Sequence, residues 1–416
     1  MARRVRKDSD RVVLQKGESQ RKNGTYCFRW VDISGVRHSV YAPTLALLRD
    51  KEKEIDMDIH DGIRADMRNR PVNEFFDLWS SIKRGVKENT MQNYRYMYNK
   101  FVRPSFGRLK LADVRKSDVR QFYLYLADKI GMKASTIDNI HNVLHQVFDM
   151  AIDDRVIRIN PASRVMREIK RTPKYKSQKR HALTIAQENM FLDYLKKSET
   201  YRRWYPVFAV MLGTGMRAGE TTGLRWCDVD FDEGYIDINH TMVYYSHEGE
   251  EGCRYDINTP KSEAGNRRIP MLDFVRDALI EEQTRQKEMG LKCRTNISGY
   301  SDFIFLHDDG SVINFGHLNK LINHVVKAHN EEALALDPQT DELLPSFSCH
   351  ILRHSFATRM CEAGVNVKVM QDVLGHSDVT ITLGIYAEAT KDLKIHEFDG
   401  LGNYFKDIRK TSFEDM

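Results

Sequence analysis

Residues 350–360, HILRHSFATRM, and residues 374–388, LGHSDVTITLGIYAE, carry the strongest signals for fold and chemistry in this chain. In the first stretch, His350 and Arg353 are three residues apart, which puts both on one face at the start of a predicted helix. An imidazole and a guanidinium in that arrangement can address a single phosphate. The spacing is common, however, and taken alone it fits an ordinary surface helix equally well.

The second stretch places a histidine and a tyrosine after a predicted helix end. Gly375 can adopt the left-handed conformation that terminates a helix and turns His376 out of it. Tyr386 follows ten residues later. Each of these two side chains, considered by itself, would ordinarily be a packing residue.

Two upstream segments add basic side chains next to turns. Residues 213–220, GTGMRAGE, form a Gly-rich turn that enters a helix, where Arg217 lies close to exposed backbone N–H groups that suit an anion. Glu220 lies on the same helix face and can hold the guanidinium. Residues 259–270, TPKSEAGNRRIP, predict a short turn between two strands with Lys261 at a hairpin tip. The alternatives are a surface arginine and a solvated lysine.

The order of these groups is more specific than any one of them. It resembles the tyrosine recombinase (phage integrase) family, whose catalytic domain carries them in this sequence, here as Arg217, Lys261, His350, Arg353, His376 and Tyr386. The resemblance extends from about residue 72 to the end of the chain. The N-terminal segment is similar to the arm-binding domain of integrases from conjugative transposons and temperate phages of Gram-positive bacteria. Ile351 and Gly384 depart from the commonest family pattern, which has polar residues at these positions.

The resemblance implies a site-specific DNA recombinase that integrates and excises a mobile element through a 3′-phosphotyrosyl intermediate. Tyr386 would attack the scissile phosphate, and Arg217 and Arg353 would offer forked donors to its non-bridging oxygens. His376 would add a third hydrogen bond.

Two further residues would handle protons. Lys261 is the candidate general acid for the leaving oxygen, and His350 would accept the tyrosine proton or share that task, since histidine exchanges protons near neutral pH. A covalent intermediate conserves the energy of the broken bond, so the mechanism needs neither a metal nor another cofactor. The absence from the sequence of a GxxxxGK[ST] loop agrees with this expectation.

Composition limits the class of protein. The 416 residues are 41% hydrophobic and 30% charged, and the mean hydropathy is −0.54. No run approaches the roughly 18 apolar residues that a membrane-spanning helix needs. We therefore expect a cytoplasmic, nucleoid-associated protein without a membrane partner. The six cysteines form no CxxC pair, so neither a zinc site nor a disulfide framework is indicated.

Basic charge is concentrated in two segments. Residues 1–24 hold eight lysines and arginines against three acidic residues, and residues 164–180 hold eight against one. Such runs are often solvated linkers, but two of them flanking a helical block favour contacts with DNA phosphates.

The predicted fold class is multidomain α+β. An arm-type DNA-binding domain of one small three-stranded sheet and a helix occupies residues 1–66, and a four-helix core-binding domain occupies residues 70–162. A basic linker spans 163–182, and a mainly helical catalytic domain with small antiparallel sheets and a C-terminal tail spans 183–416.

Local patterns predict individual elements. In the first domain, strands are expected at 11–16, 25–32 and 36–42, followed by a helix from Thr44, and Ser117 is expected to cap a helix of the second domain. In the last domain, the expected helices are 184–198, 202–213, 218–224, 271–288, 314–330, 350–363 and 366–374, and the expected strands are 235–245, 254–258, 266–270 and 303–306.

The implied partner is double-stranded DNA, at a crossover site and at distal arm sites. The linker would lie along the DNA backbone, and Arg29 or Arg37 would enter a major groove. Recombination cuts four strands, which implies a homotetramer on DNA, with the apolar tail from Leu393 to Phe405 docked on a neighbour or on its own domain. An excision factor and a DNA-bending protein are further expected partners. Two alternatives remain: a type IB topoisomerase-like nicking and resealing enzyme, and a non-catalytic DNA-binding regulator.

Overall fold

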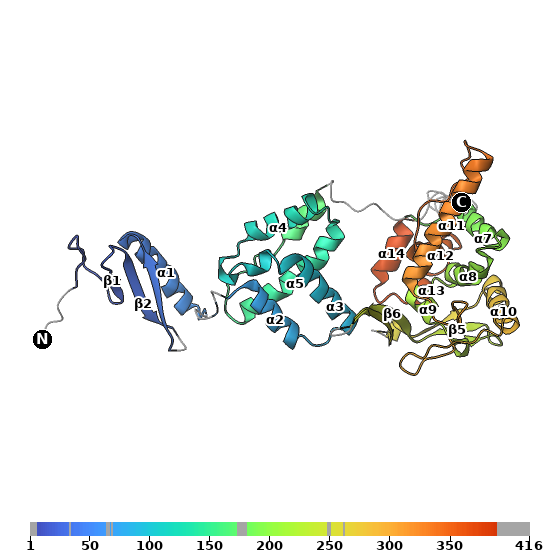
Figure 1. Cartoon of the computed structure of the whole chain (residues 1–416), viewed down its shortest axis with the longest axis horizontal. Coiled ribbons are helices and arrows are strands. Elements are labelled where there is room, and N and C mark those ends of the chain that lie inside the picture. Colours follow the sequence, from blue (N-terminus) through green and yellow to red (C-terminus); the bar gives the residue numbers. More distant parts are fainter. Residues whose placement is uncertain are drawn as a thin grey trace, which may run out of the picture. The chain divides into compact units, whose positions relative to one another are not determined.

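The computed structural model describes residues 6–32, 35–63, 67, 70–172, 181–247, 251–260 and 263–388, with the backbone alone for Glu263 and for residues 386–388. The chain divides into two compact units, residues 1–178 and residues 179–416 (Figure 1). In the described ranges, no helix is long and apolar enough to cross a membrane.

The first unit begins with a three-stranded antiparallel sheet in the order β1-β2-β3, followed by one helix. Thr44 caps the helix, because its hydroxyl accepts a hydrogen bond from the Leu47 backbone at 3.3 Å. Tyr26, Ala42 and Leu48 form the small buried core between the sheet and the helix. The elements are β1 (Glu18–Gln20), β2 (Tyr26–Val31), β3 (Arg37–Ala42) and α1 (Leu45–His60).

The strand predicted at 11–16 is wrong, because β1 begins only at Glu18. The Asp8 carboxylate accepts hydrogen bonds from the backbone N–H groups of Asp10 and Val12, and Val13 forms an isolated bridge with Lys7. The apolar run therefore folds back on the preceding residues as a tight turn and does not join the sheet.

The helical part of the first unit has five helices: α2 (Val72–Ile82), α3 (Glu88–Met97), α4 (Lys116–Asp128), α5 (Ala134–Asp153) and α6 (Val165–Arg171). One face of α5 supplies the centre of the core with six apolar residues at helical spacing, namely Ile137, Ile140, Val143, Leu144, Val147 and Phe148. The predicted Ser117 cap is wrong. The helix begins at Lys116 and its cap is Arg115, two residues before Ser117, where the Asp118 carboxylate accepts a hydrogen bond from the backbone N–H of Arg115 at 2.8 Å.

Helix α6 lies inside the segment that we expected to be a linker. Val165, Met166 and Ile169 are buried in the same core as α5, which makes α6 an integral part of the helical block. The prolines at 161 and 173 do bracket this helix, but three apolar residues at helical spacing between them are enough to dock a short one.

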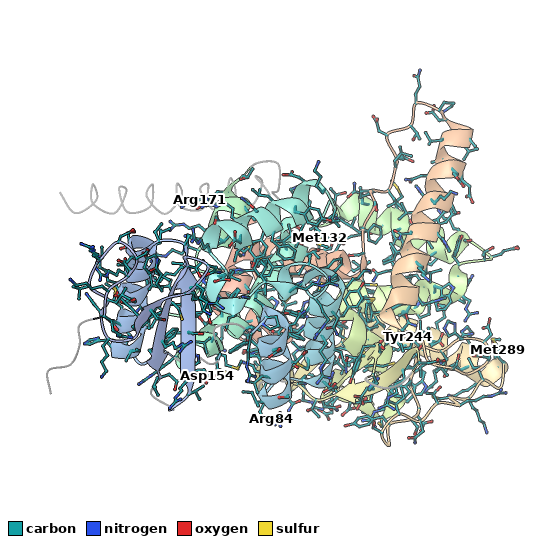
Figure 2. All side chains as sticks on the ribbon, turned by 60° about the vertical axis from the view of Figure 1, so that its left-hand side comes forward. Arg84, Met132, Asp154, Arg171, Tyr244 and Met289 are labelled. Atoms are coloured by element: carbon teal, nitrogen blue, oxygen red, sulfur yellow. The ribbon has the colours of Figure 1, made fainter. Side chains whose placement is uncertain are left out.

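The second unit is mainly helical and is built around α8 (Tyr205–Thr214), all ten residues of which are buried. The surrounding helices are α7 (Ile185–Lys197), α9 (Ala218–Gly223), α10 (Asp273–Glu288), α11 (Phe315–Leu336), α12 (Cys349–Glu362), α13 (Val367–Leu374) and α14 (Val379–Glu388). The last turns of α11 project from the rest of the unit, as Figures 1 and 2 show. This mixed architecture with small antiparallel sheets confirms the predicted fold class.

The strands of the second unit form two separate sheets. One has the order β4-β5-β8, from β4 (Val229–Asp230), β5 (Tyr235–Ile238) and β8 (Arg267–Pro270), and the other pairs β6 (Thr241–Ser246) with β7 (Cys253–Asn258). In the second sheet Tyr244, labelled in Figure 2, packs its ring 4.7 Å from that of Tyr255. These pairings place β7 and β8 in different sheets.

Two strand predictions are corrected by this topology. The predicted strand 235–245 is interrupted at residues 239–240, where the buried His240 ring lies 2.6 Å from the Gly223 carbonyl and fixes the break. The predicted strand 303–306 is absent from this described region, which has only isolated bridges at Phe303 and Leu306. The Lys261 segment also joins two sheets, so the predicted hairpin tip is wrong.

Two carboxylates lie together in the core of the N-terminal domain. Glu18 is fully buried and accepts hydrogen bonds from the Arg49 guanidinium at 2.9 and 3.3 Å. Glu52 is also buried, and its Oε1 atom has no hydrogen-bond partner among the described residues. Burial, followed by the charge of Glu18, raises the pKa of Glu52 to about 7.

Glu52→Gln should therefore stabilise the N-terminal domain at pH 8 and have little effect at pH 5. A raised pKa in the folded state means that the protonated form is favoured, and this stability is lost as pH rises from about 4.5 to about 7. Glutamine keeps the shape of the side chain and avoids the charge. Hydrogen exchange of α1 in the full chain measures the effect. Glu54→Gln, on the exposed side of the same helix, is the control, and equal effects of the two variants would contradict the prediction.

Candidate active site

Arg353 occupies the centre of the candidate site. It lies on α12, is only 5% exposed, and donates to the carbonyl oxygens of Gly215 at 2.8 Å and Leu374 at 2.5 Å. Burial, followed by the charge of Arg217, lowers the pKa of Arg353 to about 9. The group remains cationic at neutral pH, and its positive charge is held at a buried position by backbone carbonyls.

Two glycine turns shape the cradle around this arginine. Gly215 ends α8 and Gly375 ends α13, and both have left-handed backbones, with φ of 62° and 65°. A Cβ atom at position 215 would lie 2.4 Å from the Phe356 ring, and one at 375 would lie 2.9 Å from the Ala264 carbonyl. Any other residue would clash at either turn, so glycine is required for the backbone to approach the arginines closely.

Arg217 is the second arginine of the site. It caps the start of α9, and its guanidinium donates to Glu220 at 2.7 Å and to the carbonyl of Gly375 at 2.9 Å. Its side chain remains 45% exposed. The guanidinium is thus fixed by two partners and still has a face open to a ligand. The predicted pairing of Arg217 with Glu220 is present in the structure.

Glu220 holds a second arginine that the sequence interpretation missed. Arg267, on β8, donates through Nη2 to Glu220 at 2.7 Å and through Nε to the carbonyl of Val373 at 2.7 Å. Burial alone would raise the pKa of Glu220, but the hydrogen bond and charge of Arg267, with the charge of Arg217, lower it to about 2. This carboxylate is therefore ionised at neutral pH and orders both guanidinium groups.

A signal for Arg267 was present in the sequence. Residues two apart in a strand share a face, and Ile269 of the same strand is a buried core residue. An arginine on the buried face of a strand requires a partner of opposite charge, which Glu220 supplies.

His376 follows the Gly375 turn and is buried, at 8% exposed. Its Nδ1 atom lies 3.0 Å from the hydroxyl of Thr382 on α14. Burial, followed by the positive charges of Arg353, Arg217 and Arg267, lowers the pKa of His376 to about 4. The imidazole is neutral at pH 7, and it can offer a hydrogen bond without adding a further positive charge.

His350 lies in the first turn of α12 and is exposed. It lies one helical turn before Arg353 on α12, and its charge makes the smallest of the contributions that lower the pKa of His376. The residue after His350, where the family pattern often has a polar side chain, is directed into the protein, unlike the exposed histidine. Ile351 is buried in the main core, so an apolar side chain is required there in this chain.

Lys261 lies outside the described residues. The chain on either side of it is tightly folded, because a Cβ atom on Gly265 would lie 2.3 Å from the Cβ of Pro260. This connection ends at β8, the strand that carries Arg267.

Tyr386 lies in α14 by its backbone, one helical turn after Thr382, and its side chain is not described. Ile385 packs against a cluster of buried residues from α12 and α13, namely Ala357, Cys361, Met370 and Leu374. The helix that carries Tyr386 is therefore packed on the same unit that holds the arginines. The structure thus brings four predicted residues into one site (Arg217, His350, Arg353 and His376) and places the backbone of a fifth beside it.

A cluster of fixed arginines with a neutral histidine, on a mainly helical scaffold with a tyrosine-bearing helix, is the arrangement that defines the class of tyrosine recombinases. Three family models match the chain: "Phage integrase family" over residues 181–392, "Phage integrase, N-terminal SAM-like domain" over 72–127 and "DNA binding domain of tn916 integrase" over 2–59. The first of them covers half of the chain. The protein belongs to the phage integrase family and is a tyrosine recombinase, as its motifs predicted.

Individual relatives agree with this assignment. The transposase from transposon Tn916 of Enterococcus faecalis is 28% identical over 412 residues, covering 95% of this chain and 96% of the relative. The transposase from transposon Tn1545 of Streptococcus agalactiae shows the same identity and coverage. Among solved structures, the Tn1549 transposon integrase in complex with a circular intermediate DNA is 30% identical, with a TM-score of 0.69 over 80% of this chain and 99% of that one. A lambda integrase dimer, 18% identical with a TM-score of 0.53, shares the fold.

Arg267→Lys should slow DNA cleavage about ten- to a hundredfold, which corresponds to about 1.4–2.7 kcal/mol of transition-state stabilisation. Lysine keeps the positive charge but lacks the guanidinium group that bonds Glu220 and the Val373 carbonyl at the same time. Arg217 and the Gly375 turn are therefore held less firmly. Single-turnover cleavage measures the rate.

A second variant separates positioning from a general loss of stability. Arg267→Met removes a charge that lowers the pKa of His376, so NMR titration should show this pKa rising in the methionine variant and remaining low in the lysine variant. Arg268→Met, at the exposed neighbouring position, is the control. Normal cleavage by both Arg267 variants would show that this arginine does not position the site.

Proposed function

We propose that this protein is an integrase that inserts and excises a mobile element by cutting and rejoining double-stranded DNA at specific sites. The observation that carries the proposal is the buried Arg353, fixed beside Arg217 and the neutral His376 with donors available for a phosphate. The Tn1549 integrase, which shares the fold, was solved with circular intermediate DNA and with transposon right end DNA.

In the proposed reaction, the Tyr386 hydroxyl oxygen attacks the scissile phosphorus in line with the 5′ oxygen. A phosphorus–oxygen bond to tyrosine forms as the bond to the 5′ oxygen breaks, which leaves a 3′-phosphotyrosine. Arg217 and Arg353 donate to the two non-bridging oxygens and His376 donates a third hydrogen bond. Arg217, through its exposed face, is the arginine that an incoming phosphate meets first.

Two protons move in this step. Lys261 gives a proton to the departing 5′ oxygen, and His350 accepts the proton of the tyrosine hydroxyl or shares the task of Lys261. Attack by a different 5′ hydroxyl on the phosphotyrosine reverses every transfer and rejoins the strand. The energy of the original bond is conserved in the intermediate, so no metal or other cofactor is required for this sequence of steps.

The N-terminal domain is proposed to bind distal arm sites. Arg29 of β2 and Arg37 of β3 both lie on the exposed face of the sheet. In the register of the two strands, Arg29 is opposite Ser39 and Arg37 is opposite Val31. On the opposite face, the rings of Phe28 and Trp30 stack with their centroids 5.7 Å apart. The exposed face is therefore free to present both arginines to a groove of DNA.

Recombination between two duplexes requires four cuts, so we propose a homotetramer on DNA in the bacterial cytoplasm, associated with the nucleoid. An excision factor and a DNA-bending protein would set the direction of the reaction. A topoisomerase-like enzyme would instead relax plasmids steadily as a monomer, and a regulator would bind without cutting.

Mixing the protein with a library of nicked duplexes in EDTA should give DNA that stays attached after denaturation. Sequencing of the attached DNA should show a shared inverted-repeat core, because a specific site is cut by a pair of protomers. Tyr386→Phe is the control and should trap no DNA, since phenylalanine lacks the attacking oxygen. Attachment that persists in the Phe variant would exclude Tyr386 as the nucleophile, and dependence on a divalent metal would refute the metal-free mechanism.

Deleting residues 391–416 should leave DNA binding intact but impair synapsis of two sites. This tail lies outside the described residues, and the prediction rests on its apolar residues between Leu393 and Phe405. Gel-shift analysis separates single-site from paired complexes. Normal recombination by the shortened protein would mean that the tail has no part in assembly.

A further inference from the structure

Thr382 is a buried threonine of α14 whose hydroxyl bonds a side chain outside its own helix. It is fully buried, and its Oγ1 atom lies 3.0 Å from Nδ1 of His376, six positions earlier. A threonine in a helix often bonds the carbonyl four residues back. Thr214 and Thr358 do so, at 2.6 and 3.0 Å. The hydroxyl of Thr382 is instead directed to the imidazole.

The backbone of His376 is fixed independently of this contact. Its N–H donates to the carbonyl of Gln371 at 3.1 Å, and its carbonyl accepts from the Gln371 side chain at 3.0 Å. The preceding Gly375 is held by Arg217, which donates to its carbonyl at 2.9 Å. The torsions that remain are those of the ring, and among the described residues Thr382 is its hydrogen-bond partner.

Helix α14 holds Thr382 in place. At the start of the helix, the Asp378 carboxylate accepts a hydrogen bond from the backbone N–H of Thr380 at 2.9 Å. Ile385 follows Thr382 by three residues, so it shares the same helix face, and it packs on the buried cluster of α12 and α13. The hydroxyl therefore reaches Nδ1 from a fixed helix.

This contact bears on which ring nitrogen carries the hydrogen. Burial and the neighbouring arginines lower the pKa of His376 to about 4, so at pH 7 one nitrogen donates and the other accepts. A hydroxyl that donates to Nδ1 keeps the hydrogen on Nε2. Nε2 has no hydrogen-bond partner among the described residues, so it is available to a ligand. Phosphate oxygens only accept hydrogen bonds, which makes Nε2–H the useful state.

We propose that Thr382 is a positioning residue whose hydroxyl donates to Nδ1 of His376 and keeps Nε2–H as the donor for a non-bridging phosphate oxygen. Thr382 lies one helical turn before Tyr386 on α14. His376 is therefore oriented only when the helix of the proposed nucleophile is in place. The inference rests on the proposed function, since it takes a phosphate as the ligand.

The kinetic test compares two substitutions of this threonine in the full chain. Thr382→Val keeps the shape of the side chain and removes the hydroxyl, whereas Thr382→Ser keeps the hydroxyl. Single-turnover cleavage of a duplex that carries the captured crossover site should be about ten- to a hundredfold slower for the valine variant, the range typical for losing the group that orients a functional histidine. The serine variant should cleave close to the wild-type rate.

A matched control makes the same substitution elsewhere on the helix. Thr380→Val changes an exposed position of α14 and should leave the rate unchanged. Equal slowing by Thr382→Val and Thr382→Ser would assign this threonine to packing and would overturn the proposal. Cleavage by Thr382→Val at the wild-type rate would also overturn it.

A double-mutant cycle shows whether Thr382 acts through His376. His376→Phe loses one of several donors and should retain measurable cleavage. In that background there is no imidazole to orient, so Thr382→Val should not slow cleavage further. Equal slowing by Thr382→Val in both backgrounds would contradict the proposed role.

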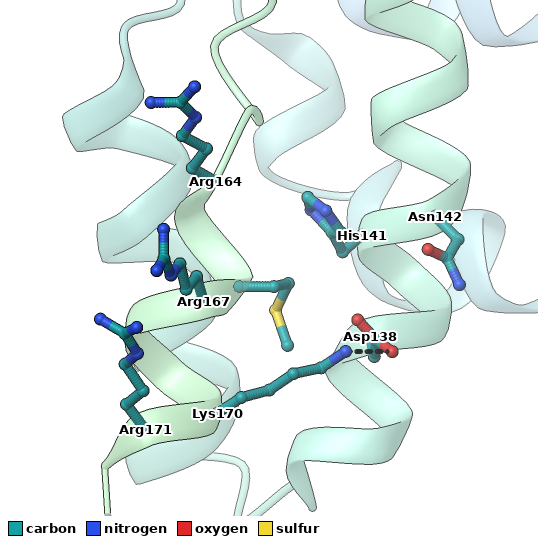
Figure 3. Close-up of a pocket in the computed structure, with 8 residues that line it drawn as sticks. Asp138, His141, Asn142, Arg164, Arg167, Lys170 and Arg171 are labelled. Atoms are coloured by element: carbon teal, nitrogen blue, oxygen red, sulfur yellow. Dashed lines mark hydrogen bonds and ion pairs between the residues drawn. The ribbon is translucent and has the colours of Figure 1, made fainter. Parts of the chain in front are cut away.

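The position of the hydrogen is measured without DNA, by NMR of the full chain with isotope-labelled histidine at pH 7. In the wild type and in Thr382→Ser, His376 should carry its hydrogen on Nε2 alone, and in Thr382→Val it should show a mixture. The signal lost in His376→Phe identifies the residue. His141 of α5, drawn in Figure 3, is the internal reference, because its Nδ1 lies 3.1 Å from the hydroxyl of Tyr123 and it belongs to the other unit.

A wild-type His376 that carries its hydrogen on Nδ1 would overturn the proposal. The NMR measurement needs no cleavage, so failure of the proposed function is distinguishable from failure of the positioning role. If the wild-type protein captures no DNA but the hydrogen lies on Nε2 and becomes mixed in Thr382→Val, the recombinase mechanism is refuted while the positioning by Thr382 stands.

Discussion

The buried carboxylate of Glu220 is the interaction on which the candidate site depends. It joins α9 and β8 by accepting from both Arg217 and Arg267, and Arg267 continues to the carbonyl of Val373 at the end of α13. Three elements that are far apart in sequence are thus held by one ion-pair network. Since a buried carboxylate left without partners is very unfavourable, the network enforces the geometry of the arginines before any phosphate arrives.

Positive charge is concentrated in this site beyond what one carboxylate neutralises. Arg353 is buried with carbonyl partners, and the low pKa of His376 shows that the surroundings already disfavour a further cation. A phosphate diester would relieve this repulsion, so the site is complementary to the anion that it is proposed to bind. Two left-handed glycines make the arrangement possible, because they let the backbone come close to the guanidinium groups.

The helical domain distributes its basic charge differently from the site. Lys170 and Arg120 are committed to acidic partners, whereas the arginines along α6 face outward from a helix that is anchored by apolar residues. The sequence shows only a basic run between two prolines, which resembles a linker. Burial of Val165, Met166 and Ile169 changes that interpretation, because it makes α6 an integral part of the helical block.

The sequence by itself determined the family, the fold class and the order of the site residues, because local motifs and hydrophobic periodicity are visible in the sequence without the tertiary structure. The helix that starts at Thr44 and the glycine turn before His376 were both predicted correctly. Only the tertiary structure decided how strands pair and which charges meet. Thus β7 and β8 separate into two sheets, and Arg267 finds Glu220 across 47 positions of sequence. Such contacts depend on long-range packing, which a one-dimensional pattern does not encode.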